Sequence, residues 1–283
     1  MSFAEYVYTT ILKPPLLKAA ANWVILRLLP EKLRVEEAVI VLNPDDPVVS
    51  GALTFGVYEK PERHFLRRIL RPGQTVLDIG ANVGLYSAMA AVRVGNEGKV
   101  VAFEPDPVSL AFLEKTIATN RLRNVEVIAA AASDEPGNLR LYFSPGNRGD
   151  NRLYQHRQDQ DSVLVDTVRV DNQLEVMNIN EVDVIKIDVQ GFEGHVIDGM
   201  HHILKNSRRL VMLTEFWPQG LHQAGTDPLE FLERLQGFGL SVYELGKRGD
   251  CVPVADFAEL ISRFSGRAYT NLVLLASEAV IDD

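Results

Sequence analysis

The sequence predicts a doubly wound α/β fold, in which helices cover both faces of a mostly parallel sheet. From residue 75 onward, short apolar runs alternate with longer runs of helix formers, and strands connected through helices form right-handed βαβ units. Several short runs are apolar throughout, which is typical of strands buried on both faces. The chain has 283 residues, 46% hydrophobic and 24% charged, which favours one large domain with an extension.

Local composition places the individual elements. The helix expected at 82–95 closes on a glycine, and the helix at 107–122 carries Pro107 at a first-turn position. Alternating apolar and polar residues at 138–144 and 162–170 predict an antiparallel pair. The other expected strands are 75–80, 99–105, 125–133, 182–189, 209–217, 240–246 and 271–277, and the other helices are 191–204 and 227–239.

Three regions are expected along the chain: an N-terminal helical extension or lid at 1–47, a main domain at 48–283, and an insertion near 138–170. Residues 16–30 are strongly apolar but include charged residues, so they predict a helix that packs on the domain or lies on a membrane surface. No apolar run is long enough for an ordinary transmembrane helix.

The net charge and the cysteine content limit the partners and the cellular location that we expect for the protein. The formal net charge is −9, which argues against a nucleic-acid partner because phosphate binding needs a basic face. The single cysteine, Cys251, excludes an intrachain disulfide and fits a reducing, cytoplasmic location. The oligomeric state does not follow from the sequence.

Residues 144–161 form a long polar stretch, and loops of this length in compact domains are usually functional or disordered. The alternative is a solvated hairpin tip. Its arginines are fork donors suited to oxygen-rich ligands, so we expect them to act on an acceptor and to leave cofactor binding nearly unchanged. The candidate substrate-binding residues are Arg148, Asn151, Arg152 and His156.

The stretch "DIGANVG" at 78–84 ends the first strand of the predicted sheet. Its two glycines allow the backbone to pass close to a ligand. The second strand ends in Glu104, where a carboxylate can accept two hydrogen bonds from a ribose diol. A nucleoside-bearing cofactor is therefore expected. The dinucleotide pattern G-x-G-x-x-G fails, because Asn82 and Leu85 stand where it needs glycine.

The remaining pattern, D-x-G-x-x-x-G followed by an acidic second strand, resembles the first motif of class I S-adenosylmethionine-dependent methyltransferases. Five blocks in order, "VVSGALTFGVYEKPERHFLRRILRPGQTVLDIGANVGLYS", "VVAFEPDP", "AAASDEPG", "VIKIDVQGFEGHVIDGM" and "TEFWP", look like the FkbM family of methyltransferases over roughly residues 48–220. The resemblance implies a Rossmann-like, seven-stranded fold. It also implies S-adenosylmethionine as cofactor and methyl transfer, often to hydroxyls of sugars or secondary metabolites.

The resemblance also implies which residues hold the cofactor. The glycine stretch would lie against the methionine portion, Glu104 would hold the ribose, and the residues after the third strand, with Asp134 nearby, would flank the adenine. The bland alternatives are that Asp78 caps a turn and Glu104 is an exposed loop acid. The implied cofactor residues are Tyr58, Glu59, Asp78, Gly80, Asn82, Gly84, Glu104, Ala132 and Ser133.

The strand "VIKIDV" carries two charges, Lys186 and Asp188, which strand alternation places on one face. Glu215 at the end of the next strand is expected to come near both. A lone buried charge is costly, so Lys186 is interpreted as an electrostatic anchor for the two carboxylates. Asp188 or Glu215 would act as base toward an acceptor hydroxyl, with Glu193 and His195 just beyond.

Other interpretations stay open at this point. Asp188 and Glu215 could instead hold a divalent metal such as Mg²⁺, or the charges could form a structural ion cluster. His195 could serve only helix packing. The competing functions are a nicotinamide-dependent oxidoreductase on a similar sheet and a non-catalytic family member that binds the cofactor. Neither the acceptor nor O- against N-methylation follows from the sequence.

Overall fold

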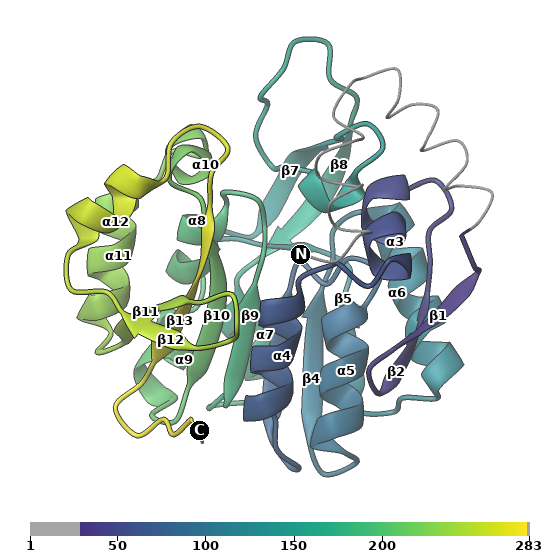
Figure 1. The fold of residues 1–283 in the computed structure, drawn as a ribbon, viewed down its shortest axis with the longest axis horizontal. Coiled ribbons are helices and arrows are strands. Elements are labelled where there is room, and N and C mark those ends of the chain that lie inside the picture. The colour runs from purple at the N-terminus through teal and green to yellow at the C-terminus, as the bar shows by residue number, and fades with distance from the viewer. Residues whose placement is uncertain (1–28, 282–283) are drawn as a thin grey trace.

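The computed structural model describes residues 29–281, and its centre is one eight-stranded sheet (Figure 1). The strand order is β12-β11-β13-β10-β9-β3-β4-β5. The strands are β3 (Thr75–Ile79), β4 (Lys99–Phe103), β5 (Val125–Ile128), β9 (Val184–Ile187), β10 (Val211–Phe216), β11 (Ser241–Leu245), β12 (Cys251–Pro253) and β13 (Thr270–Leu275). Strands β10, β9, β3, β4 and β5 run parallel, whereas β13 is antiparallel to both β10 and β11.

The predicted α/β class is confirmed, but the sheet has eight strands rather than seven. The additional strand is β12, which pairs antiparallel with β11 at the sheet edge. The strand order reverses beside β3, which pairs with β4 on one side and with β9 on the other. In α/β sheets, ligands bind at the carboxyl ends of the strands at such a reversal.

Two hydrophobic cores flank the sheet. Val76, Val100 and Val184 pack beneath α4 and α5, and their sequence neighbours Leu77, Val101 and Ile185 pack beneath α7, α8, α9 and α11. Apolar residues at successive strand positions therefore bury both faces, as the sequence predicted. The helices are α3 (Pro47–Thr54), α4 (Lys60–Ile69), α5 (Leu85–Val94), α6 (Pro107–Asn120), α7 (Val170–Val176), α8 (Glu193–Asp198), α9 (His201–Asn206), α10 (Pro218–Gln223), α11 (Pro228–Gly237) and α12 (Phe257–Arg263).

A second, three-stranded sheet stands at the carboxyl ends of the main strands (Figure 1). Its strands are β6 (Ala131–Ala132), β7 (Gly137–Tyr142) and β8 (Ser162–Val168), and β7 pairs antiparallel with β8 as predicted. The strand expected at 125–133 is divided, because only 125–128 joins the main sheet and Ala131–Ala132 joins this one.

The prediction of a helical extension at 1–47 is wrong where the structure describes it. There the chain forms a hairpin, β1 (Lys32–Val35) and β2 (Ala38–Val41), with Glu36 at a φ of 52° in its turn. Asn120 on α6 holds β2 through its side chain, which accepts from Val39 N at 2.8 Å and donates to Val39 O at 2.6 Å. The helix expected at 16–30 lies almost entirely outside the described residues.

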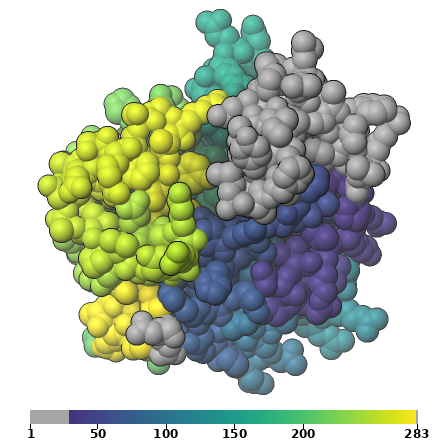
Figure 2. Space-filling model, viewed as in Figure 1, coloured from purple at the N-terminus to yellow at the C-terminus, as the bar shows by residue number. Residues whose placement is uncertain are grey.

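The helix expected at 191–204 is also divided, into α8 and α9. The break falls at Gly199, where a Cβ would lie 2.1 Å from Ser133 O. Figure 2 shows the C-terminal part of the chain beside α4 on one face, where Arg68 donates to Gly249 O at 3.1 Å.

Between residues 29 and 281, no helix has the length and apolar character needed to cross a membrane.

Candidate active site

A cavity with about 870 Å³ of empty space, part of it open to solvent, lies where the loops after β3, β4 and β9 meet the loop at 144–161. The residues lining it that the sequence had singled out are Tyr58, Gly80, Asn82, Glu104, Ala132, Arg148, Asn151, Lys186 and Asp188.

The first glycine of the motif is required by a close contact between two loops. Gly80 has a φ of +83°, and a Cβ there would lie 2.0 Å from the carbonyl oxygen of Asp188. The glycine-rich loop therefore sits directly against the end of β9. Gly84 has another role and does not line the cavity. A Cβ at Gly84 would lie 2.6 Å from Leu113 Cδ1, so this glycine serves the packing of α5 against α6.

Glu104 is a buried wall residue of the cavity, only 6% exposed, so the interpretation as an exposed loop acid is wrong. Its Oε2 accepts from Asn82 N at 2.6 Å and its Oε1 accepts from Asp106 N at 2.8 Å. Burial raises the pKa of Glu104 to about 8, although both hydrogen bonds oppose the shift. The carboxylate thus ties the glycine-rich loop to the start of α6.

Asp78 does not line the large cavity, contrary to the expectation that it contacts the cofactor. Its Oδ2 accepts from Ser87 Oγ at 2.5 Å, and its Oδ1 is buried without a hydrogen-bond partner among residues 29–281. Asp78 lies in register with Lys186 on the neighbouring strand. Burial raises the pKa of Asp78, and the charge of Lys186 opposes that shift. Asp78 therefore acts behind the site, as a counter-charge to Lys186.

Lys186 and Asp188 lie together, as strand alternation predicted. Lys186 Nζ is 3.5 Å from Asp188 Oδ2 and 3.5 Å from Gly80 O, and Lys186 is only 7% exposed. Burial lowers the pKa of Lys186, but Asp188, Asp78 and Glu59 raise it by more, so the pKa lies above its ordinary value. The ammonium group is therefore charged and holds the surrounding carboxylates.

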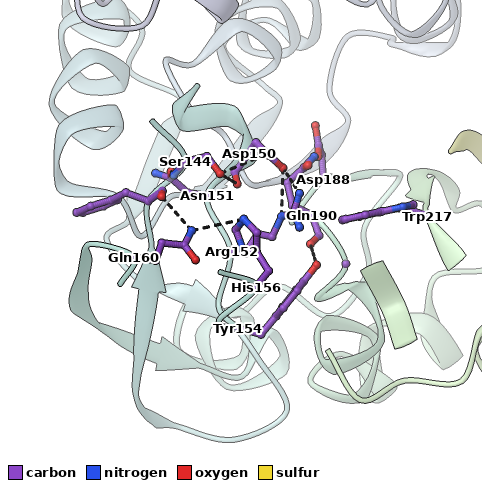
Figure 3. A network of polar contacts seen from close by, with 12 residues as sticks. Ser144, Asp150, Asn151, Arg152, Tyr154, His156, Gln160, Asp188, Gln190 and Trp217 are labelled. Atoms are coloured by element: carbon purple, nitrogen blue, oxygen red, sulfur yellow. Dashed lines mark hydrogen bonds and ion pairs between the residues drawn. The ribbon is translucent and has the colours of Figure 1, made fainter. Parts of the chain in front are cut away.

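Gln190, which the sequence reading missed, fixes the other side of Asp188. Its Nε2 donates to Asp188 Oδ1 at 2.7 Å, and its backbone oxygen accepts from Tyr154 Oη at 2.9 Å (Figure 3). Gln190 has a φ of 55°, which is uncommon for a residue with a side chain. A Cβ on the next residue, Gly191, would lie 2.6 Å from Gly220 C. The hydrogen bond from Tyr154 and the close contact with Gly220 thus hold the turn at 190–191 in its conformation.

Behind Asp188 lies a second cavity of about 320 Å³, which Lys186, Asp188 and Glu215 all line. The structure therefore brings these three residues together, as predicted. Glu59, expected at the cofactor, lines this cavity instead and accepts from Tyr86 Oη at 2.6 Å. Glu215 is 9% exposed, and its side-chain carboxylate has no hydrogen bond or ion pair with any residue between 29 and 281.

The structure does not support the alternative that Asp188 and Glu215 hold a metal. Within the described part of the chain, no group of three or more His, Cys, Asp or Glu side chains is placed to bind a metal ion. The charged neighbour of Asp188 is the Lys186 ammonium group at 3.5 Å. Metal-assisted chemistry at these two carboxylates is therefore not supported by the arrangement of the described residues.

The two arginines of the loop at 144–161 that were expected to bind the acceptor, Arg148 and Arg152, point to different places. Arg148 Nη1 donates to Asp106 Oδ1 at 3.0 Å and to Oδ2 at 2.7 Å, and both residues line the large cavity. Asn151 Nδ2 donates to the same carboxylate at 3.1 Å. Arg152 is 4% exposed, pairs with Asp150 at 2.5 Å, and lies 4.5 Å from the ring centroid of Trp217 (Figure 3).

Arg152 and Trp217 belong to an open groove of about 810 Å³, whose wall also includes Glu59, Glu215 and Tyr269. The groove and the large cavity meet, because both are lined by the same five residues. These shared residues are Val49, Tyr58, Gly149, Asp188 and Gln190.

Four other predicted residues do not line these cavities: Ser133, His156, Glu193 and His195. His195 bridges Asp134 at 3.2 Å and Ala224 O at 2.9 Å, and its ring stacks on Phe192. Glu193 is fully buried, and its Oε1 accepts from Val189 N and Gly191 N. The interpretation of these two as catalytic groups is therefore replaced by a structural one, because their partners hold them elsewhere.

These features define a cavity that opens onto a groove beside two carboxylates, an arrangement that suits a cofactor-dependent group-transfer enzyme. Residues 78–242 match the family described as "Methyltransferase FkbM domain", and this match covers more than half of the chain. The chain therefore belongs to the FkbM methyltransferase family and is a methyltransferase.

Individual relatives are similar over parts of their length. The chain is 28% identical over 209 residues to 2-O-methyltransferase NoeI of Sinorhizobium fredii, covering 68% of this chain and 83% of the relative. It is 40% identical over 77 residues to 31-O-demethyl-FK506 methyltransferase FkbM of Streptomyces tacrolimicus, covering 27% and 28%. The solved methyltransferase FkbM from Methylobacillus flagellatus matches with a TM-score of 0.46 and 15% identity, over 91% of this chain and 60% of that one.

Proposed function

We propose that the protein transfers a methyl group from S-adenosylmethionine to a hydroxyl of a sugar or a secondary metabolite. The observation that carries the proposal is the junction of the large cavity with the groove at Asp188 and Gln190. The relatives add support for an oxygen acceptor, since one is named a 2-O-methyltransferase and another a 31-O-demethyl-FK506 methyltransferase.

The large cavity fits S-adenosylmethionine. Glu104 offers a buried carboxylate to a ribose diol, and the small side chain of Ala132 leaves room on the wall for an adenine. Gly80 leaves no Cβ between the ligand and the end of β9. Tyr58 lies where the cavity meets the groove. The bound cofactor would supply an electrophilic methyl group at this junction.

The protein's own part in the reaction is to hold an acceptor oxygen in line with the methyl group and to remove its proton. A spacing of about 3 Å between the reacting atoms supplies much of the rate, and a positioned base adds roughly 10²–10⁴-fold. Asp188 is held by Lys186 and Gln190, so it suits the orientation of the acceptor hydroxyl. The carboxylate of Glu215 has no partner between residues 29 and 281, so it suits the uptake of the proton.

The groove favours acceptors that carry hydroxyl donors rather than negative charge. Its wall includes the carboxyl groups of Glu59, Asp150, Asp188 and Glu215, against the cations of Arg152 and Arg267. Asp150 already pairs with Arg152. Sugar hydroxyls can donate to the remaining carboxylates, whereas a phosphate or carboxylate on the acceptor would be repelled.

The test is transfer of a labelled methyl group from S-adenosylmethionine to a panel of neutral glycosides and polyhydroxylated metabolites. We expect incorporation that depends on Asp188. Binding of the cofactor without transfer to any hydroxyl acceptor would favour a non-catalytic member of the family. A cytoplasmic location and a membrane contact through the helix expected at 16–30 stay predictions.

A further inference from the structure

The small cavity behind Asp188 is lined by more acidic than basic side chains. Its wall carries the carboxyl groups of Glu59, Glu62, Asp188 and Glu215, and among the described residues its lining cation is Lys186. These groups come from the start of α4 and the ends of β9 and β10. If all of them ionise, four negative charges face one positive charge.

Three of the four carboxylates have partners inside the cavity. Tyr86 Oη donates to Glu59, Asn271 Nδ2 donates to Glu62, and Lys186 pairs with Asp188. The carboxylate of Glu215 has no hydrogen bond or ion pair with residues 29–281, although the residue is only 9% exposed. Buried carboxylates are normally paired because desolvation of a lone charge is costly. Glu215 therefore marks a place where a positive charge is missing.

The proton affinities agree with this excess of acid. Burial and the charge of Asp188 together raise the pKa of Glu59 to about 7, against the opposing effects of Lys186 and the Tyr86 hydrogen bond. Burial and then Asp188 also raise the pKa of Glu215 well above its ordinary value. A positive charge close by would reverse both effects.

The small cavity adjoins the large one. Tyr86, Lys186 and Asp188 line both, so Asp188 faces the acidic cluster on one side and the cofactor cavity on the other. A cation at the junction of the large cavity and the groove would lie within reach of the cluster. In a partly buried site, one charge pair several ångströms apart is worth about tenfold or more in affinity.

We propose that this acidic cavity distinguishes the charged cofactor from its neutral product: it favours the sulfonium of S-adenosylmethionine and disfavours S-adenosylhomocysteine. The inference rests on the proposed function. The positive charge is lost from sulfur when the methyl group leaves, so the cavity weakens the hold on the product and favours its exchange. Asp188 and Glu215 thereby act on the cofactor as well as on the acceptor.

The experiment is calorimetric titration of the full chain with three probes that share the adenosine portion. S-adenosylmethionine and sinefungin, whose additional ammonium group replaces the sulfonium, carry a positive charge at this position, whereas the sulfur of S-adenosylhomocysteine is neutral. We expect the wild type to bind both cations more tightly than the neutral probe. Glu215→Gln and Glu62→Gln keep the side-chain shape and should each reduce this preference about tenfold.

Glu230→Gln is the control, because it removes one charge from an exposed residue on α11. We expect it to leave the preference unchanged. An equal preference in wild type, Glu215→Gln and Glu62→Gln overturns the inference, as does a wild type that favours the neutral probe. In both cases the proposed function stands, since the probes bind. Failure of all three probes to bind the wild type overturns the proposed function as well.

Discussion

At the scale of single residues, the site depends on two carboxylates in different surroundings. Asp188 accepts from Gln190 and pairs with Lys186, so its orientation is fixed. Glu215 is buried without such partners between residues 29 and 281. Pairs of acids whose environments differ in this way commonly divide binding and proton transfer between them.

Asp188→Asn keeps the shape of the side chain and removes its charge. We expect an unchanged fold and a kcat lower by about 10²-fold or more, because the acceptor hydroxyl loses its charged partner. Steady-state kinetics with a labelled methyl donor and thermal unfolding measure the two effects. A variant that loses stability while kcat survives would make the charges of this strand structural.

Glu104 gives the protein a pH-dependent stability in the absence of ligand. Burial raises its pKa to about 8, so the folded state binds a proton that the unfolded chain releases near pH 4.3. The raised pKa of Glu104 therefore stabilises the folded state fully below about pH 4.3, the pKa in the unfolded chain. This stabilisation is lost as the pH rises toward 8. Urea unfolding from pH 5 to 8.5 should show a smaller decline for Glu104→Gln than for the wild type. Equal declines would contradict the assignment.

At the scale of elements, the loop at 144–161 joins the cavity to the groove. Both arginines were expected to act on the acceptor, but Arg148 pairs with Asp106 on the wall of the large cavity. Arg148→Ala should therefore weaken S-adenosylhomocysteine binding about tenfold, because buried Asp106 loses its cation. Arg157→Ala, on an exposed position of the same loop, is the matched control. Equal affinities of the two variants in calorimetry would show that Arg148 and its loop do not contribute to the cofactor site.

The loop also supports the turn after β9, through the hydrogen bond from Tyr154 to the backbone oxygen of Gln190. Tyr154 lines neither the large cavity nor the groove. Tyr154→Phe should lower the free energy of unfolding by about 1 kcal/mol and reduce kcat with little change in cofactor affinity. A kcat equal to that of the wild type would show that this bond does not position Asp188.

At the scale of the whole molecule, the local sequence pattern was enough to predict the class of fold and several of the residues around the large cavity. Gly80, Glu104 and Asp188 follow continuous apolar strands, Lys186 lies within one, and parallel strands place their ends at one edge of the sheet. The sequence did not reveal the split at Gly199, since this depends on a contact with Ser133 from a distant segment.

The predictions that failed for single residues did so for one physical reason. His195 and Glu193 carry suitable chemistry, but neither lines the cavity. His195 is held by Ala224 O, and Glu193 by the backbone N–H groups of the turn after β9. Gln190 and Trp217 were missed because their roles depend on Tyr154 and Arg152, which lie far away in the chain. Side-chain partners across segments are not contained in a local pattern.

The central claim is that the cavity ending at Glu104 binds S-adenosylmethionine. The most direct measurement is calorimetric titration of wild type and Glu104→Ala with S-adenosylhomocysteine, with NAD as the competing ligand. We predict that the wild type binds S-adenosylhomocysteine and not NAD. Loss of two charge-assisted hydrogen bonds should weaken binding to Glu104→Ala about 100-fold. An unchanged affinity in a folded Glu104→Ala protein, or binding of NAD instead, would contradict the account.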